Sequence, residues 1–186
     1  MDKATDLHNK LVEAAAEHDE ALMEKFFMEE PLNEDELRLG IRKGLASRGM
    51  FPVFCVCAVK DMGVSRLMEF LGNVVPFVDD MPAVKNTAGE EVKPDPNGPT
   101  SVFFFKTSVE PHIGDVQYFK VMSGTLKEGD DLTNADRGSK ERIAQIYSPA
   151  GANREKVEMM VAGDIGCTVK LKDVRVGNTL HGKDIA

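Results

Sequence analysis

Residues 101–122 read SVFFFKTSVEPHIGDVQYFKVM, two strand-length segments on either side of a turn signal at Gly114-Asp115. The second segment, Val116–Met122, ends at another turn signal, Ser123-Gly124. A period of two places successive side chains on opposite faces of a sheet. The first segment has this period, because Phe104 and Lys106 alternate with Phe103, Phe105, Thr107 and Val109. The stretch therefore predicts two successive β-strands.

The rest of this half of the chain repeats the rhythm. Its plainest strand is Ile165–Leu171, where apolar residues alternate with Gly166, Thr168 and Lys170. Further turn signals lie at residues 128–130, 137–138 and 176–178. Short strands at about ten-residue spacing are typical of small antiparallel barrels and sandwiches. We predict a β-barrel of about six or seven strands over residues 100–186.

The aromatic residues of this half allow two interpretations. An exposed row of rings on a sheet can stack on nucleic-acid bases. Rings on the strands of a small barrel more often fill its core. The period of two puts Phe103 and Phe105 on one face. We therefore expect core packing for the set Phe103, Phe104, Phe105 and Phe119.

Prolines gather in the middle of the chain. Proline lacks an N–H donor and disfavours helix in the residue before it. Gly89 and Gly98 lie in the same region and are common in loops. These residues predict a linker over 82–99 rather than a regular element, with residues 1–81 as a separate domain. Five of the nine prolines fall here: Pro76, Pro82, Pro94, Pro96 and Pro99.

The first residues of the chain have an acidic amphipathic pattern. Apolar side chains recur every three or four residues over 7–26, which predicts a helix that Pro31 ends. Residues 1–36 hold twelve acidic side chains against three lysines, whereas the remaining 150 residues hold nineteen acids and twenty bases. The net charge of −8 therefore describes this segment and does not exclude nucleic-acid binding by the rest. Its carboxylates either face solvent or contact basic proteins.

A second helix is predicted after Pro31. Asn33 followed three residues later by Glu36 is a capping-box signal, and an apolar stripe follows it. Gly40 and Gly44 weaken a helix, so we expect this one to be short.

The apolar run FPVFCVCA, Phe51–Ala58, has the length of a strand buried on both faces of a parallel sheet. Gly63 follows, and then residues 64–75 carry apolar side chains at helical spacing. A buried strand, a short loop and an amphipathic helix form one half of a βαβ unit. Residues 1–81 are therefore predicted to be part of an α/β domain.

Composition limits the class of protein. No run of eighteen apolar residues exists to span a membrane, and no apolar leader opens the chain, so we expect a cytoplasmic location. Cys55, Cys57 and Cys167 lack the spacing of a redox or zinc motif, and we expect them to pack as small apolar residues. The four histidines are scattered, so we expect no metal site.

Nucleotide hydrolysis needs a P-loop, GxxxxGK[ST], whose backbone N–H groups cradle the phosphates beside Mg²⁺. The sequence contains no such motif and no Asn-Lys-x-Asp motif. We expect that the chain as given does not hydrolyse GTP.

Several short motifs nevertheless occur in an order that resembles elongation factor G, a translational GTPase. The resemblance begins at Phe51–Lys60 and covers essentially the whole chain. It implies the end of a GTPase domain followed by the domain II barrel, in a fragment without the phosphate site. The other motifs are Leu11–Glu17, Leu22–Lys25, Val121–Leu126, Lys127–Asp130, Gly138–Ile143, Val161–Ile165 and Val176–Leu180. Val176 and Asn178 depart from the family's usual Thr-Gly-Asp-Thr-Leu, which suggests a divergent paralogue.

The resemblance implies a guanine-reading loop at Cys57, Ala58 and Lys60. In the family this loop is Ser-Ala-Phe-Lys, and the alanine N–H donates to the guanine carbonyl. Cys57 replaces the serine, which exchanges a good hydroxyl donor for a weak thiol donor. The cofactor implied for the intact parent is GTP or GDP with Mg²⁺, and none is expected for the fragment.

The resemblance also implies a partner, the ribosome, on which the parent drives translocation of tRNA and mRNA. In the family the barrel docks on small-subunit rRNA and braces the GTPase switch regions. Arg137, Lys140 and Arg142 cluster around one turn and are the candidate rRNA contacts. Residues 101–186 carry twelve bases and twelve acids, so a solvated hairpin is the alternative.

Other functions fit the same pattern. A tetracycline-resistance ribosomal protection protein and the GTPase that recycles release factors share the barrel. A non-nucleotide-binding interaction module, whose α/β part is complete by itself, is an alternative of another class. It predicts a cooperative melt of residues 1–81 alone, whereas a fragment of a GTPase domain would fold poorly.

Overall fold

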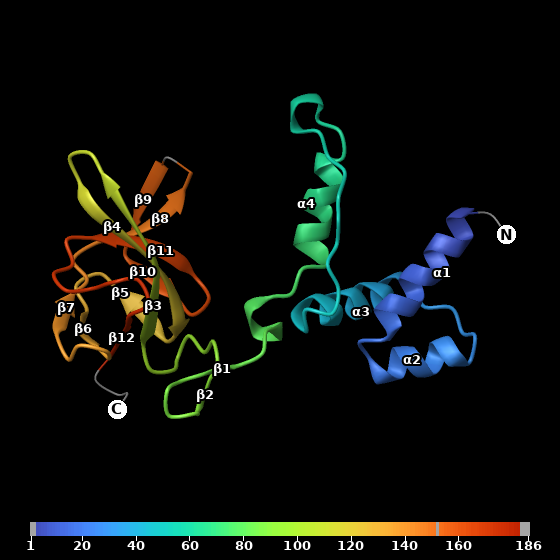
Figure 1. Cartoon of the computed structure of the whole chain (residues 1–186), viewed down its shortest axis with the longest axis horizontal. Coiled ribbons are helices and arrows are strands. Elements are labelled where there is room, and N and C mark those ends of the chain that lie inside the picture. The colour runs from blue at the N-terminus through green and yellow to red at the C-terminus, as the bar shows by residue number, and fades with distance from the viewer. Residues whose placement is uncertain (1–2, 152, 183–186) are drawn as a thin grey trace. The chain divides into compact units, whose positions relative to one another are not determined.

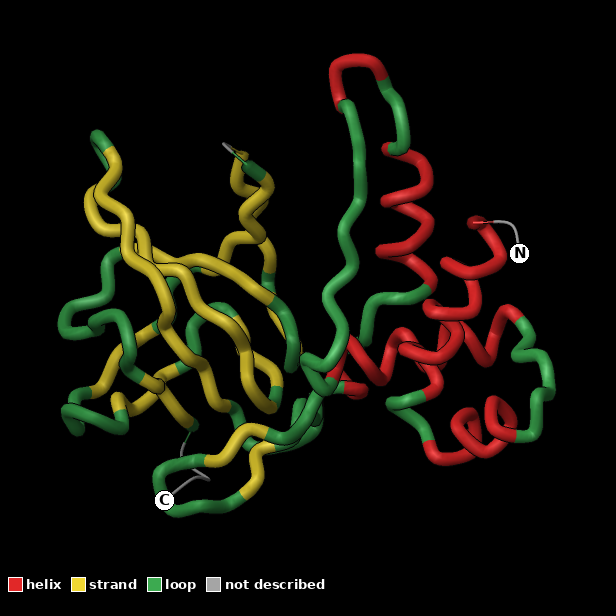
Figure 2. Tube along the Cα trace, turned by 45° about the vertical axis from the view of Figure 1, so that its right-hand side comes forward, coloured by secondary structure: helices red, strands yellow, loops and turns green. Residues whose placement is uncertain are grey.

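The computed structural model describes residues 3–151 and 153–182. The chain divides after Pro82 into two units, a helical one and a β-sheet one. Figure 1 colours both along the chain, and Figure 2 shows that helices and strands are segregated between them. The predicted fold class was part of an α/β domain followed by a small antiparallel β-barrel, and the order of helices and then an antiparallel sheet agrees with it. The predicted domain ends at residues 1–2 and 183–186 lie outside the described residues.

The acidic segment forms two helices, α1 (Lys3–Ala16) and α2 (Glu20–Phe27), where one was predicted. The break has a local cause, because the Asp19 carboxylate accepts a hydrogen bond from the Leu22 N–H at 3.0 Å and so caps a new helix. It also has a packing cause, because the turn allows Ala16 and Leu22 both to be buried. The apolar side chains keep their helical spacing across this break, so the sequence pattern did not reveal it.

Helix α3 (Glu34–Ala46) begins at the predicted capping box, in which Asn33 and Glu36 exchange side-chain and backbone hydrogen bonds of 2.9 and 3.0 Å. It runs for 13 residues, so the expectation of a short helix was wrong. Its glycines allow close contact instead. A Cβ on Gly40 would lie 2.5 Å from the Ala15 carbonyl oxygen. Packing against α1 therefore offsets the low helix propensity of glycine.

The predicted buried strand at Phe51–Ala58 is wrong in this structure. Residues 51–56 are extended and exposed, and Cys57 makes only an isolated bridge to Met62. A strand exists through hydrogen bonds to a neighbour, and none of the described residues pairs with 51–56 as a strand. Two 3₁₀ turns, Ala58–Lys60 and Val78–Asp80, flank the predicted helix α4 (Val64–Asn73).

The extended segment and α4 lie side by side, as Figures 1 and 2 both show. The Phe54 and Phe70 rings join them, with centroids 4.8 Å apart. The geometry of a βα half-unit is thus present although the strand lacks partners. Phe51 and Val53 remain 76% and 90% exposed.

The predicted linker contains a small element of its own. Strands β1 (Val84–Lys85) and β2 (Glu91–Val92) pair antiparallel within residues 82–99. The end of the linker is bonded to the barrel, because the Gly124 N–H donates to the Asp95 carbonyl at 2.7 Å.

The second unit is an antiparallel sheet with the strand order β7-β6-β12-β3-β4-β11-β8-β9, and β5 pairs separately with β10. It has more strands than the six or seven predicted, and β5, β7, β10 and β12 are only three residues long. The strands predicted at residues 101–122 and at Ile165 are confirmed. Their bounds are β3 (Ser101–Glu110), β4 (Gly114–Ser123), β5 (Thr125–Lys127), β6 (Asp131–Asn134), β7 (Lys140–Arg142), β8 (Ile146–Ala150), β9 (Asn153–Val157), β10 (Met159–Val161), β11 (Ile165–Val169) and β12 (Thr179–His181).

The sheet curves around one apolar core. Leu132 on β6 and Ile146 on β8 belong to the same buried cluster, although β12, β3, β4 and β11 lie between their strands in the sheet order. Phe104 and Phe119 are register partners at its centre, with ring centroids 5.7 Å apart. Such curvature lets strands that are far apart in the order share one core, as in a barrel, while β7 and β9 remain the two ends of the strand order.

Two of the predicted core phenylalanines are not in the core. Phe103 and Phe105 are 36% and 40% exposed, whereas Phe104 and Phe119 are buried as expected. Period two forces neighbours onto opposite faces, and Phe104 takes the inner position. A register shift between Phe104 and Lys106 places Phe105 in a bulge.

The cysteine prediction is right for one residue of three. Cys167 is fully buried in a small cluster with Val116 and Val169 on the other face of the sheet. Burial raises the pKa of its thiol, against the opposing effect of the nearby Arg154 guanidinium. Cys55 is exposed and Cys57 is half-buried, because the segment that carries them has no sheet to enter.

Candidate functional site

The basic residues predicted to contact RNA lie on one hairpin, formed by β6 and β7. Lys140 and Arg142 are the first and last residues of β7, and both are exposed. The residue between them, Glu141, is only 3% exposed and faces the interior. Because β7 ends the strand order of the sheet, both cations are carried on a rigid element with an open side.

Arg137 lies in the turn between these strands and is ion-paired with Asp173. Its side chain is 31% exposed, so the pair only partly neutralises it. Across the hairpin, Lys140 is opposite Thr133 and Arg142 is opposite Asp131. The structure therefore groups the three predicted cations, with Lys140 in the least acidic position.

Sequence reasoning missed Glu141, whose buried side chain connects this hairpin to the loop at residues 172–173. Its carboxylate accepts hydrogen bonds from the backbone N–H groups of Lys172 at 3.0 Å and Asp173 at 2.7 Å. These bonds satisfy a buried charge and place Asp173 next to Arg137. The available signal was an acidic residue between two basic ones, at the inward position of a strand with period two.

The predicted guanine-reading residues lie together in a tight loop of the helical unit. Cys57 and Met62 exchange backbone hydrogen bonds of 2.9 and 3.0 Å, and Lys60 N–H donates to the Cys57 carbonyl. Ala58 begins the enclosed 3₁₀ turn, where an N–H has no partner within the turn. Ala58 and Lys60 are exposed. The loop thus brings the three residues together, and guanine recognition by them stays a prediction.

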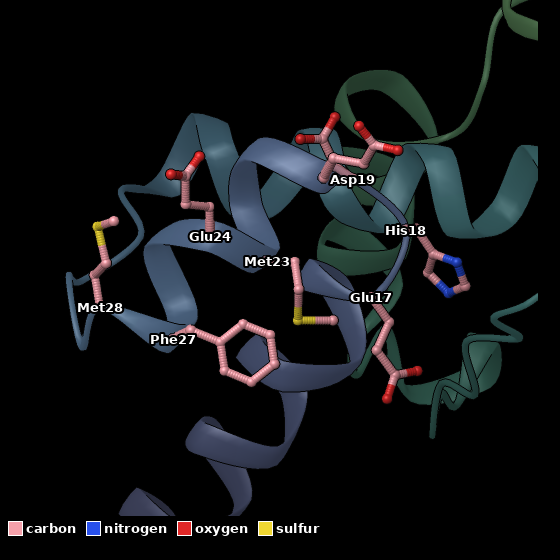
Figure 3. A pocket seen from close by; sticks show the side chains of 8 residues that line it. Glu17, His18, Asp19, Met23, Glu24, Phe27 and Met28 are labelled. Carbon is pink, nitrogen blue, oxygen red and sulfur yellow. The ribbon is translucent and has the colours of Figure 1, made fainter.

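A hollow of about 610 Å³ lies where α1 meets α2. Figure 3 shows its lining, which combines the carboxylates of Glu17 and Glu24 with apolar side chains. Phe27 and Met28 remain 76% and 61% exposed there. Apolar surface surrounded by negative charge is suited to an amphipathic basic segment.

Asp19 lies in the turn between α1 and α2, which we call the corner, and is one of the residues that line this hollow. Its carboxylate pairs with Lys43 of α3 in addition to capping α2. The hydrogen bond from Lys43, and then the one from the Leu22 N–H, lower the pKa of Asp19 below its ordinary value. The corner is therefore held by a carboxylate that stays ionised.

The described part of the chain offers neither a metal-binding cluster nor a helix suited to span a membrane. Residues 3–151 and 153–182 contain no group of three metal-binding side chains. Within the same ranges, no helix is both long and apolar enough to cross a bilayer.

Comparison with known proteins finds similarities for the barrel and for the chain as a whole. Residues 99–183 match the family model described as elongation factor G domain 2. A crystal structure of a protein from Thermus thermophilus superposes with a TM-score of 0.72 and 25% sequence identity. The match covers 94% of this chain and 24% of the Thermus chain. This chain therefore spans about a quarter of that protein's length, and the similarity includes both units.

Proposed function

We propose that the chain serves as part of a G-type factor that drives GTP-dependent translocation of tRNA and mRNA, because residues 99–183 match the family model of elongation factor G domain 2. The similarity to a much longer protein over both units supports this reading. The proposal places the chain in the cytoplasm, on the ribosome.

The barrel's part in this function is docking on small-subunit rRNA. The docking proposal rests mainly on the edge strand β7, where Lys140 and Arg142 are exposed and their neighbour Glu141 is hydrogen-bonded in the interior. Phosphate contacts need cations on a fixed frame, and their contribution weakens as salt competes for the phosphates. Arg137 adds a third contact after its pair with Asp173 opens or is shared.

Nucleotide binding belongs to the longer protein under this proposal. The Ala58 N–H would read the guanine carbonyl, and GTP with Mg²⁺ would need a phosphate site that this sequence lacks. Titration of the chain with a fluorescent GDP analogue should show no saturable binding. Micromolar affinity would contradict the assignment of the loop as one element of a larger site.

Cosedimentation with small ribosomal subunits tests the docking. The chain should bind at low salt, and binding should fall as salt rises. Lys140→Ala with Arg142→Ala should reduce affinity by about tenfold or more, since each phosphate contact contributes separately. The matched control, Lys85→Ala with Lys93→Ala, removes the same charge from exposed linker positions. Equal losses in both double variants would mean that only net charge matters.

The acidic hollow supports a second contact, with a basic segment of a ribosomal protein. Titration with a lysine-rich amphipathic peptide should show binding that Glu17→Gln with Glu24→Gln weakens. The control Glu29→Gln with Glu30→Gln removes the same charge from exposed positions outside the hollow lining. If both double variants weaken binding equally, the peptide responds to net charge and the hollow has no role.

A further inference from the structure

The turn of the β6–β7 hairpin is held by amides and carboxylates from two distant parts of the chain. Asn134, at the end of β6, is fully buried. Its Nδ2 donates to the Asp173 carbonyl at 3.0 Å and to Asn178 Oδ1 at 3.2 Å. Its Oδ1 accepts from the Asp136 N–H at 3.1 Å. Every polar atom of this buried side chain is thus satisfied, which leaves it one orientation.

Asn178 continues the network with both ends of its amide. Its Oδ1 also accepts from the Arg175 N–H at 2.9 Å. Its Nδ2 donates to Asp136 Oδ2 at 2.9 Å. The same carboxylate oxygen accepts from the Thr179 N–H at 3.3 Å. Position 178 therefore needs an acceptor on one side and a donor toward Asp136 on the other.

This pair lies beside the backbone bonds that fix the hairpin. The Ala135 N–H donates to the Thr179 carbonyl at 2.9 Å, next to the Asp136–Asn178 contact. The Gly138 N–H donates to the Asn134 carbonyl at 2.8 Å and closes the turn that carries Arg137. The turn itself is exposed and therefore has little packing to hold it. The direction of the basic hairpin thus depends on this polar network.

We infer that Asp136 and Asn178 form a positioning pair, which fixes the basic hairpin against the loop before β12 and so sets its affinity for RNA. The affinity part rests on the proposed function. Carboxylate and amide are complementary here, whereas two carboxylates would repel and leave no donor between them. The identity of residue 178 is therefore tied to that of residue 136.

A charge-matched swap tests the pair in the full chain. Asn178→Asp places two carboxylates together, and exchange of the Ala135 and Gly138 amide hydrogens, whose acceptors are backbone carbonyls, should accelerate by about tenfold or more. The double variant Asp136→Asn with Asn178→Asp can form the bond between the two side chains with donor and acceptor reversed. It has the wild-type charge, and exchange should return to the wild-type rate. Asn153→Asp, on the exposed start of β9, adds one negative charge elsewhere as a control.

Affinity for small ribosomal subunits at low salt is the second readout. Asn178→Asp should bind several-fold more weakly than Asn153→Asp, and the swap should restore wild-type affinity. Equal affinities for Asn178→Asp and Asn153→Asp, or a swap that fails to restore amide protection, would overturn the inference. If the wild-type chain does not bind subunits, the docking proposal fails by itself. The exchange rates then decide whether the pair positions the hairpin.

Discussion

Asp19 has two roles at the corner between α1 and α2, a helix cap and an ion pair, and only the ion pair needs its negative charge. Its carboxylate caps α2 through the Leu22 N–H and pairs with Lys43. Asparagine caps a helix about as well as aspartate but cannot form the ion pair. Asp19→Asn should therefore cost up to about 1 kcal/mol of stability at neutral pH, the typical range of such a pair. Asp19→Ala should cost about 1 kcal/mol more through the lost cap. Denaturant unfolding followed by the helical circular dichroism signal measures both.

The pH dependence of Asp19 has a definite sign. Because the pKa of Asp19 is lowered in the folded chain, its stabilisation is complete above the unfolded value of about 4 and is lost as pH falls through the folded pKa. The difference between wild type and Asp19→Asn should thus shrink below about pH 4. A difference that grows on acidification would contradict the Lys43 pairing.

Adjacent phenylalanines on β3 should respond very differently to truncation. Phe104 is 1% exposed and its ring is tilted against that of Phe119, with centroids 5.7 Å apart, so Phe104→Ala should destabilise the barrel by about 3–5 kcal/mol. Phe105, in the bulge, is the matched control, and Phe105→Ala should cost about 0.5 kcal/mol, as for surface substitutions. Chemical denaturation of the two variants measures the difference. Similar losses would mean that Phe105 packs in the core.

At the scale of elements, replacing a glycine by alanine should have opposite effects on stability in α3 and in α4. In Gly40→Ala the new Cβ would meet the Ala15 backbone at 2.5 Å, and the clash should exceed the gain in helix propensity. We expect a net loss of about 1–3 kcal/mol. Gly72 in α4 has no atom within 4 Å of such a Cβ, so Gly72→Ala should stabilise that helix by about 0.5–1 kcal/mol. Urea unfolding of both variants checks the signs, and a stabilising Gly40→Ala would refute the close crossing of α1 and α3.

Elements held by local contacts were predictable, and those that need a partner were not. The capping box of α3 involves residues three apart, so sequence spacing alone identifies it. Residues 51–56 have the composition of a buried strand, but pairing is a property of two segments. In the candidate site, the exposed cations Lys140 and Arg142 could be found from sequence. The buried support from Glu141 depends on a loop that lies about thirty residues further along the chain.

At the scale of the whole molecule, the two units differ in how completely they bury apolar surface. The barrel has a large apolar core and a smaller buried cluster on the other face of its sheet, whereas the helical unit leaves Phe51, Val53 and Met68 exposed. We expect the barrel to melt in one cooperative transition and the helical unit to melt broadly at lower temperature. Thermal unfolding followed separately by helix and tyrosine signals tests this, because both tyrosines, Tyr118 and Tyr147, lie in the barrel.

A single sharp transition in both signals would favour the interaction-module alternative, in which the helical part is complete by itself. Dye binding to exposed apolar surface is the independent check. It should be lost in Phe51→Ser with Val53→Ser, and persistence there would locate the exposed surface elsewhere.

The sequence by itself determined the order of the molecule: acidic helices, a proline-rich connection and a barrel whose strands follow period two. These features arise from the local geometry of the backbone, in which a residue's neighbours decide helix, turn or strand. Only the tertiary structure decided that Phe104 rather than Phe103 enters the core, that α1 ends at Ala16, and that residues 51–56 pair with no strand among the described residues. It also decided that Asn178 supports the basic hairpin across more than forty residues. Each of these depends on contacts between distant segments, and sequence spacing carries no information on them.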